Sequence, residues 1–159
     1  GEVPELDVRI TNNTDDSIYM IGSLDNSDTK RRMPQCYYEI AKPAPDTIFF
    51  SRCGFANPLR VEDFKVVKSR ETFNPFESID SHGFFPDYAS TQEETFRNPG
   101  IYKIQFHYST NDAHIDRFIG SIFIETWAKH YDTAAIYKLF AKVPRVELVS
   151  NTIEIEIKK

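Results

Sequence analysis

The stretch that most restricts the fold is residues 98–110, which read NPGIYKIQFHYST. A Pro-Gly pair interrupts regular structure, and large apolar side chains then recur at every second position, at Tyr102, Ile104, Phe106 and Tyr108. A period of two places these side chains on one face of an extended strand. The pattern therefore predicts a half-buried strand of the kind found in antiparallel sheets, with one apolar and one polar face.

Similar alternation occurs along most of the chain, between turns rich in Asn, Asp, Pro and Gly. In residues 152–157, TIEIEI, the Ile side chains are expected to face inward and the Glu side chains outward. The other predicted strands are 6–10, 17–21, 36–42, 46–53, 59–67, 101–109, 117–125 and the 145–157 region. The abundant Phe and Tyr favour strands as well. Together these signals predict an all-β, immunoglobulin-like antiparallel sandwich of about 7–9 strands.

One segment has a helical period instead. Between Asp132, which can cap a helix, and Pro144, which ends one, apolar residues follow the i, i+3, i+4, i+7 spacing. We therefore expect one short α-helix at about 133–142. The 159 residues suffice for one domain with a sizeable core and are few for two. Residues 1–159 are thus predicted to form a single domain.

The turn before the 101–109 strand predicts a specific contact. In immunoglobulin-like sandwiches, a Tyr near the start of strand F turns its hydroxyl back onto the upstream backbone and forms a tyrosine corner. Here Asn98 takes the place of the usual Asp, Gly100 supplies the turn, and Tyr102 is the corner residue. Ile104 stands where antibody domains carry a disulfide-bonded Cys, so that bridge is absent at this position.

Four short motifs carry a family resemblance. They are the Asn-rich turn between two strands at 10–19, Lys-Ser-Arg-Glu at 68–71, Pro-Gly-Ile-Tyr opening the strand at 99–108, and Ser-Asn-Thr-Ile at 150–153. In them the chain resembles bacterial secreted or lipoprotein Ig-like sandwich domains of unknown function, which are similar in shape to the BsuPI-type proteinase-inhibitor domain. The resemblance implies a secreted, periplasmic or cell-surface location, and it allows a lipid anchor attached through a removed leader.

Three features depart from that family's pattern. Ser69 and Arg70 stand where the family often carries Pro-Gly, and the 77–97 insertion and the 133–142 helix are additions. No inhibitory reactive site is therefore carried over to this chain.

The two cysteines, Cys36 and Cys53, flank a predicted hairpin. With the turn centred on residues 44–45, Ile40 would face Phe49 and Cys36 would face Cys53. Directly opposed residues have Cα atoms about 4.5–5.5 Å apart, which a disulfide can span. The sequence leaves both a disulfide and two buried thiols open.

No motif indicates catalysis or a metal. The four His residues form none of the paired spacings of metal sites, and His107 falls on the polar face of its predicted strand, where we expect it to point to solvent. Asp80-Ser81-His82 puts triad residue types side by side, but neighbours on a loop cannot easily meet as nucleophile and base. We therefore expect a protein that is not an enzyme and needs no metal or other cofactor.

The segment least explained by the fold is 77–96, which is acidic and carries Phe84, Phe85 and Tyr88. Aromatic side chains on a long loop can stack on a sugar or anchor a protein partner. The alternative is structural, with Phe84 and Phe85 tucked under the loop to close one end of the fold. These three residues are the predicted ligand-binding candidates.

Charge and hydropathy exclude some partners. The net charge is −5 and the basic residues are scattered, which argues against nucleic acid. No apolar run approaches the length of a membrane span. We therefore expect a non-catalytic extracytoplasmic binding or structural module, whose first interpretation is interaction with a protein partner or a cell-surface assembly. The alternatives are glycan binding through the 84–88 aromatics and a proteinase-inhibitor-like domain.

Overall fold

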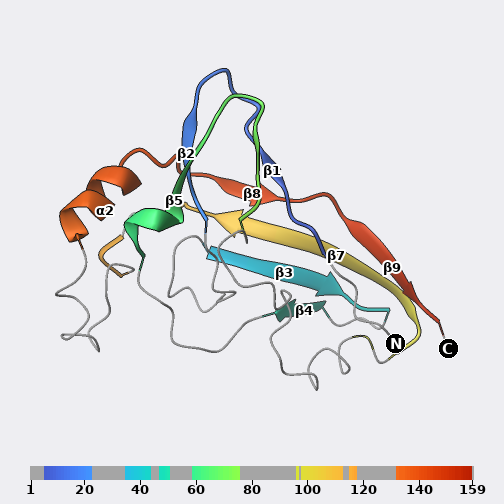
Figure 1. Ribbon diagram of the computed structural model, residues 1–159. Helices are drawn as coiled ribbons and strands as arrows, with labels where there is room; N and C mark the ends of the chain where they lie inside the picture. The colour runs from blue at the N-terminus through green and yellow to red at the C-terminus, as the bar shows by residue number, and fades with distance from the viewer. Residues whose placement is uncertain are drawn as a thin grey trace.

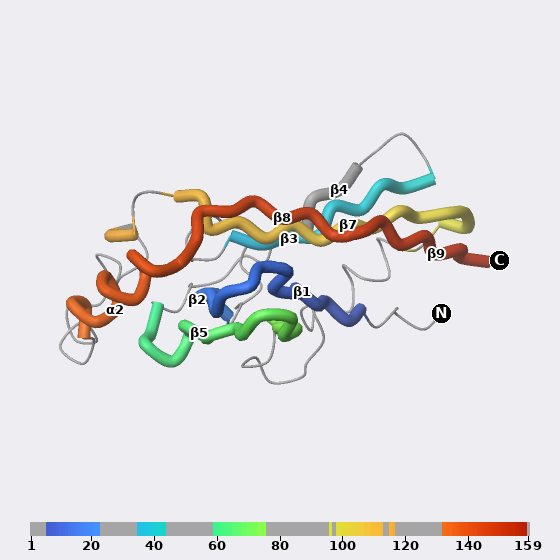
Figure 2. The backbone as a smooth tube through the Cα atoms, turned by 90° about the horizontal axis from the view of Figure 1, so that it is seen from above, coloured from blue at the N-terminus to red at the C-terminus, as the bar shows by residue number. Residues whose placement is uncertain are grey.

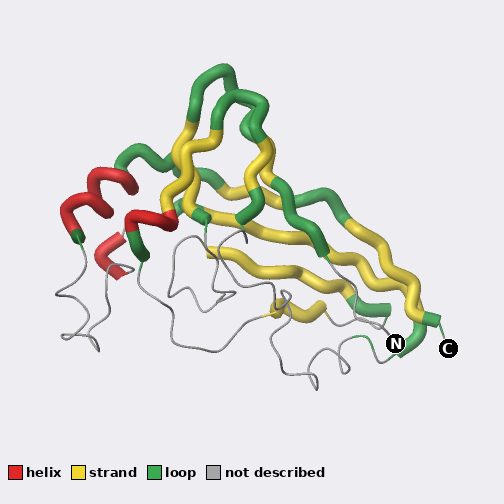
Figure 3. Tube along the Cα trace, viewed as in Figure 1, coloured by secondary structure: helices red, strands yellow, loops and turns green. Residues whose placement is uncertain are grey.

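The computed structural model describes residues 6–22, 35–43, 47–50, 59–75, 96, 98–112, 115–117 and 132–158. These parts of the chain are mostly β, in several antiparallel sheets, with one α-helix at one end (Figure 1, Figure 3). The prediction of an all-β chain with a short helix is confirmed at this level.

The main sheet is built around β7 (Gly100–Ser109), the strand predicted from the opening alternation. Antiparallel to it, β3 (Gln35–Ala41) pairs along its whole length, and β4 (Thr47–Phe50) continues the sheet beyond β3. On the other side of β7, two strands pair with it in antiparallel fashion. β9 (Ile153–Ile157) lies beside the first half of β7, and β8 (Glu147–Val149) lies beside its last residues. The order is therefore β4-β3-β7, with β8 and β9 sharing one edge.

Two smaller antiparallel pairs form a second layer. β1 (Ile10–Thr11) pairs with β6 (Thr72–Phe73), and β2 (Ile18–Ile21) pairs with β5 (Phe64–Val67). Figure 2 shows β1, β2 and β5 in a layer of their own alongside the strands of the main sheet. Two layers are what half-buried strands require, because each layer covers the apolar face of the other.

The principal core lies on the inner face of β7. Its four alternating apolar residues are each 4% exposed or less, as the sequence pattern predicts. They pack in one cluster with residues of β3 and of the second layer, among them Tyr38, Ile40, Met20, Val67 and Phe73. A second, smaller cluster lies under the helix and comprises Ile21, Leu59, Phe64, Ile115, Ile136, Phe140 and Val143. Burial of this apolar surface is the main force that holds the layers together.

One hydroxyl joins the two layers directly. Tyr108 Oη donates to the carbonyl of Ile21 at 2.9 Å and accepts from the Ile21 N–H at 3.2 Å. Burial raises the pKa of Tyr108 well above its usual range, because the phenolate would have to lose its hydration. Burial raises the pKa of Tyr38 in the same way.

The helix α2 (Thr133–Phe140) begins where the sequence predicts. The Asp132 side chain accepts from the Ala135 N–H at 2.9 Å and caps the first turn. The helix ends two residues before the predicted boundary, because the N–H of Lys142 bonds to the carbonyl of Leu139 in a tighter turn. Figure 3 shows α2 at the opposite end of the molecule from the C-terminal end of β9.

Some predicted boundaries are wrong. The expected 59–67 strand is β only from Phe64, because a 3-10 turn, η1 (Val61–Asp63), precedes it. Asp63 Oδ2 accepts from the Arg60 N–H at 2.8 Å and stabilises that turn. Of the expected 6–10 strand, only Ile10 is paired, in β1. Of the expected 117–125 strand, only Arg117 is described, as the last residue of the 3-10 turn η2 (Ile115–Arg117).

The hairpin register also differs from the prediction by one residue. Ile40 is opposite Ile48 rather than Phe49, and Tyr38 is opposite Phe50. The predicted pairing of Cys36 with Cys53 assumed the other register, and a slip of one residue moves every side chain of a strand to the opposite face. Cys36 is buried in β3, whereas Cys53 lies outside the described residues, so the disulfide itself stays a prediction.

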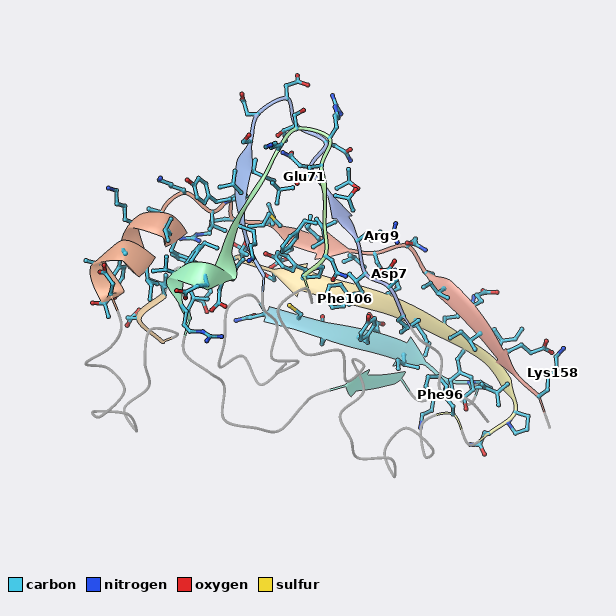
Figure 4. The ribbon with its side chains drawn as sticks, in the orientation of Figure 1. Asp7, Arg9, Glu71, Phe96, Phe106 and Lys158 are labelled. Atoms are coloured by element: carbon cyan, nitrogen blue, oxygen red, sulfur yellow. The ribbon has the colours of Figure 1, made fainter. Side chains whose placement is uncertain are left out.

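The turn at 68–71 holds Arg70 in an unusual backbone conformation. Arg70 has φ +63°, in the left-handed region where glycine is normally favoured. Its guanidinium donates to the Asn13 carbonyl at 3.0 Å and pairs with Asp15 at 3.0 Å, across the neighbouring turn. The Glu71 carboxylate accepts from the Lys68 N–H at 2.7 Å and closes the turn (Figure 4). Side-chain contacts thus hold a backbone conformation that Arg rarely adopts.

Candidate functional site

The residues singled out in the sequence fall into two groups. Phe84, Phe85 and Tyr88 lie outside the described residues, so their role as ligand contacts stays a prediction. Tyr102 is fully buried, and its hydroxyl donates to the Asn98 carbonyl at 2.8 Å. The Tyr102 hydroxyl thus hydrogen-bonds to the backbone four residues upstream and is buried. This contact holds the turn before β7 in place.

The turn before β7 is tightly packed. Gly100 has φ +140°, and a Cβ at this position would lie 2.6 Å from Pro43 Cγ, so only glycine fits without a shift. Phe96 packs edge-on against the Tyr102 ring, with centroids 5.1 Å apart (Figure 4). These contacts fix the start of β7 and hence the facing of every later side chain in the strand.

The outer face of β7 carries an arrangement that the sequence did not reveal. Tyr37 of β3 and His107 of β7 are direct cross-strand partners, and their rings stack in parallel with centroids 4.4 Å apart and an interplanar angle of 6°. On the other side of β7, His107 is paired with Val149 of β8. Tyr37, His107 and Val149 therefore form one row across three strands, which we call the outer row.

A carboxylate holds the imidazole of the outer row. Glu39 is two residues after Tyr37 on the same face of β3, and its Oε2 lies 3.0 Å from His107 Nε2. The His107 side chain is 20% exposed and that of Glu39 35% exposed. His107 thus lies on the outward face as predicted, but its side chain is only 20% exposed, because Tyr37 covers one face of the ring and Glu39 engages one nitrogen.

A β-bulge places Val149 beside this imidazole. Between the pairs Ile104–Ile153 and His107–Val149, two residues of β7 oppose three residues, 150–152, of the partner strand. Ser150 fills the break: its Oγ accepts from the Phe106 N–H and its N–H donates to the Phe106 carbonyl, both at 2.9 Å. The extra residue reverses the register of facing, so Val149 is opposite the outward His107, whereas Ile153 is opposite the inward Ile104 and is itself 39% exposed.

The outer row is apolar and aromatic at its centre and acidic at its sides. Val149 is 55% exposed, and Tyr37 is half-buried. Glu39 flanks the row on one side, and Glu147, which is opposite Ser109, flanks it on the other. An exposed apolar centre with a polar rim is the composition of a protein-recognition patch.

Chemically, the outer row can offer ring contact, a hydrogen-bond partner and negative charge. The Glu39 contact fixes the imidazole orientation, and among the described residues the second ring nitrogen has no hydrogen-bond partner. Within the described ranges, no group of three or more His, Cys, Asp or Glu is placed to hold a metal ion. No helix in the described part of the chain has the length and apolar character to cross a bilayer.

Sequence reasoning missed the outer row for a definable reason. The alternation in CYYEIA places Tyr37 and Glu39 on the polar face of their strand, and His107 was placed on the polar face of its own. Their meeting depends on the β3–β7 register, which joins residues about 70 positions apart. The available signal was an aromatic residue and a His on the outward faces of two predicted strands.

Comparison with known proteins gives no function for this surface. The chain matches no family model, no curated protein and no solved structure.

Proposed function

We propose that this chain is a non-catalytic binding module whose outer row docks a protein partner. The observation that carries the proposal is the position of Val149, which is 55% exposed beside the stacked rings of Tyr37 and His107. Exposed apolar side chains next to ordered aromatic rings are typical of the centre of a protein interface.

The chemistry of the partner follows from the rim. Glu39 and Glu147 place carboxylates on both sides of the outer row, and the chain has a net charge of −5. A partner that presents an apolar or aromatic side chain flanked by Lys or Arg would complement this surface. The Glu39–His107 contact already fixes two of the side chains, which lowers the entropy lost on binding.

The architecture and location are part of the same proposal. Two packed β layers and the hydroxyl-to-backbone contact of Tyr102 support an immunoglobulin-like sandwich. A location outside the cytoplasm rests on the family resemblance of the four motifs. A partner in a cell-surface or periplasmic assembly is consistent with both.

Selection of peptide ligands tests the proposal. A random peptide library displayed on phage would be selected against the whole chain, and each enriched peptide would be measured against Val149→Asp and Tyr37→Ala variants. We expect enriched peptides to be basic with a large apolar residue, and to lose about tenfold or more in affinity to Val149→Asp, because a charge is then placed at the apolar centre. Isothermal titration calorimetry would give the affinities.

A matched control keeps the test specific to the outer row. Val66, on β5 of the second layer, is 52% exposed and close to Val149 in exposure. Val66→Asp makes the same chemical change elsewhere and should leave affinity within about twofold. The proposal would be contradicted if enriched peptides bound Val149→Asp as tightly as the parent, or if Val66→Asp weakened binding as much as Val149→Asp. It would also be contradicted if no peptide were enriched.

A further inference from the structure

A group of cations lies at the C-terminal end of α2. Lys138 is in its last turn, and Lys142 and Arg145 follow in the exposed chain after it. Among the described residues, none of the three forms an ion pair with a carboxylate. The chain as a whole has a net charge of −5, so these three cations form a positively charged region on an otherwise acidic protein.

Aromatic rings hold two of these cations. Lys142 Nζ lies 4.8 Å from the centroid of the Tyr19 ring and 3.4 Å from its hydroxyl oxygen. The Arg145 guanidinium lies 3.7 Å from the centroid of the Phe140 ring. Cation–π contacts of this kind orient a charged group without neutralising it. Both cations are therefore ordered and still able to bind an anion.

An exposed aromatic side chain directly precedes Lys138 on α2. Tyr137, on the exposed side of α2, is 48% exposed. Lys138 lies in the last turn of α2, and Lys142 lies four positions later in the tighter turn that follows the helix. We call Tyr19, Tyr137, Lys138, Lys142 and Arg145 the basic patch.

We propose that the basic patch binds an acidic segment of a protein partner. The three cations can each donate hydrogen bonds to a carboxylate, and the two tyrosine hydroxyls can donate hydrogen bonds to the same segment. Anionic membranes fit less well, because basic clusters that bind them generally carry about four to eight Lys or Arg residues.

This binding site does not depend on the outer row. Its residues belong to β2, α2 and the chain after α2, whereas the outer row belongs to β3, β7 and β8. The charge preferences are opposite, since the outer row has an acidic rim and the basic patch is cationic. Loss of one interaction would therefore leave the other measurable.

The test uses a fluorescein-labelled peptide of alternating Glu and Ser, with a Gln-for-Glu version as the uncharged comparison. Fluorescence anisotropy at low salt would report binding to the whole chain. We expect the Glu peptide to bind, the Gln peptide not to bind, and Lys142→Gln or Arg145→Gln to weaken binding about three- to fivefold each. Raising the salt concentration should weaken binding further, because these cations are exposed.

Lys68→Gln is the matched control, since it removes one exposed positive charge from a turn of the second layer. This variant should change affinity by less than about twofold, because Lys68 is not part of the basic patch and would form no direct ion pair with the bound peptide. Lys142→Arg should keep binding, which separates the loss of charge from a folding defect.

Three results would overturn the inference. One is equal weakening by Lys68→Gln, which would indicate diffuse attraction by charge alone. Another is failure of the Glu peptide to bind at low salt. A third is tighter binding to phosphatidylserine vesicles than to the peptide with the same dependence on Lys142, which would assign the basic patch to a membrane surface.

Discussion

The two faces of β7 differ in what determines them. On the inner face, four alternating side chains are 4% exposed or less and pack into the core between the layers. On the outer face, neighbouring residues of the same strand are exposed or half-buried, and they include Lys103 and His107. Which residues face inward can be predicted from the alternation of apolar side chains within the strand itself. The outer residues gain their roles from cross-strand neighbours that are distant in sequence.

This difference separates stability from recognition along one strand. An inner side chain contributes through buried apolar area and tight packing, so its loss should weaken the whole fold. An outer side chain contributes little to folding, because solvent replaces most of its contacts. Substitutions on the inner face should therefore affect stability, and substitutions on the outer face should affect binding.

The largest expected effect is at Ile104, which is 1% exposed in the principal core. Ile104→Ala removes buried methyl groups and leaves a cavity, which should lower the free energy of unfolding by about 2–5 kcal/mol. Urea denaturation followed by circular dichroism would measure the loss.

The neighbouring residue on the opposite face provides the control. Lys103 is exposed and pairs with Glu154 at 3.0 Å, so Lys103→Ala should change stability by less than about 1 kcal/mol. If the two variants lost similar amounts, the assignment of the two faces would be wrong.

The next effect is a loss of stability at alkaline pH. Burial raises the pKa values of Tyr108 and Tyr38 in the folded state, while in the unfolded state both titrate near pH 10. Above pH 10 the unfolded state releases these protons and the folded state keeps them, so stability falls as pH rises. Each buried tyrosine should contribute a decrease of about 1 kcal/mol between pH 10 and 11, and the slope should approach about 1.4 kcal/mol per pH unit above pH 11. Below about pH 9 these two groups should contribute no pH dependence.

A Tyr108→Phe variant isolates one of these groups. At neutral pH it should lose about 1–3 kcal/mol, because the N–H and carbonyl of Ile21 lose their partner in the core. Its stability should then fall less steeply above pH 10 than that of the parent. Guanidinium titrations from pH 8 to 11 would compare the two slopes, and equal slopes would show that Tyr108 is not buried as a neutral phenol.

The sequence predicted features that depend on neighbours along the chain. Alternation gave the inner face of β7 and the packing of Ile155 and Ile157 of β9 against the core, whereas Ile153, also predicted to face inward, is 39% exposed. Asp132 and the helical spacing gave the start of α2. These signals are local, because a strand or helix repeats its facing every two or 3.6 residues. The same local logic placed His107 on the outer face correctly.

Features that depend on register were not predictable from the sequence. The register of the β3–β4 hairpin is shifted by one residue from the register that would place Cys36 opposite Cys53. The bulge at Ser150 places Val149 opposite the outward His107 and Ile153 opposite the inward Ile104, although both positions are odd-numbered. Strand pairing is set by packing of whole layers and by turn geometry, so single-strand patterns do not determine it. The outer row depends on the β3–β7 and β7–β8 registers, so the sequence alone could not predict it.

The smallest expected effect on stability is on the outer face, and it completes the comparison. Glu39→Gln keeps a hydrogen-bonding side chain beside His107 but removes the negative charge. Because both side chains retain solvent contact, the free energy of unfolding should change by less than about 1 kcal/mol. Binding of a basic peptide selected on the outer row should nevertheless weaken about three- to fivefold, since one of its acidic contacts is lost. Paired chemical denaturation and calorimetry would measure both quantities on one sample. A loss of stability as large as that of Ile104→Ala would mean that the two faces of β7 are not separate in function.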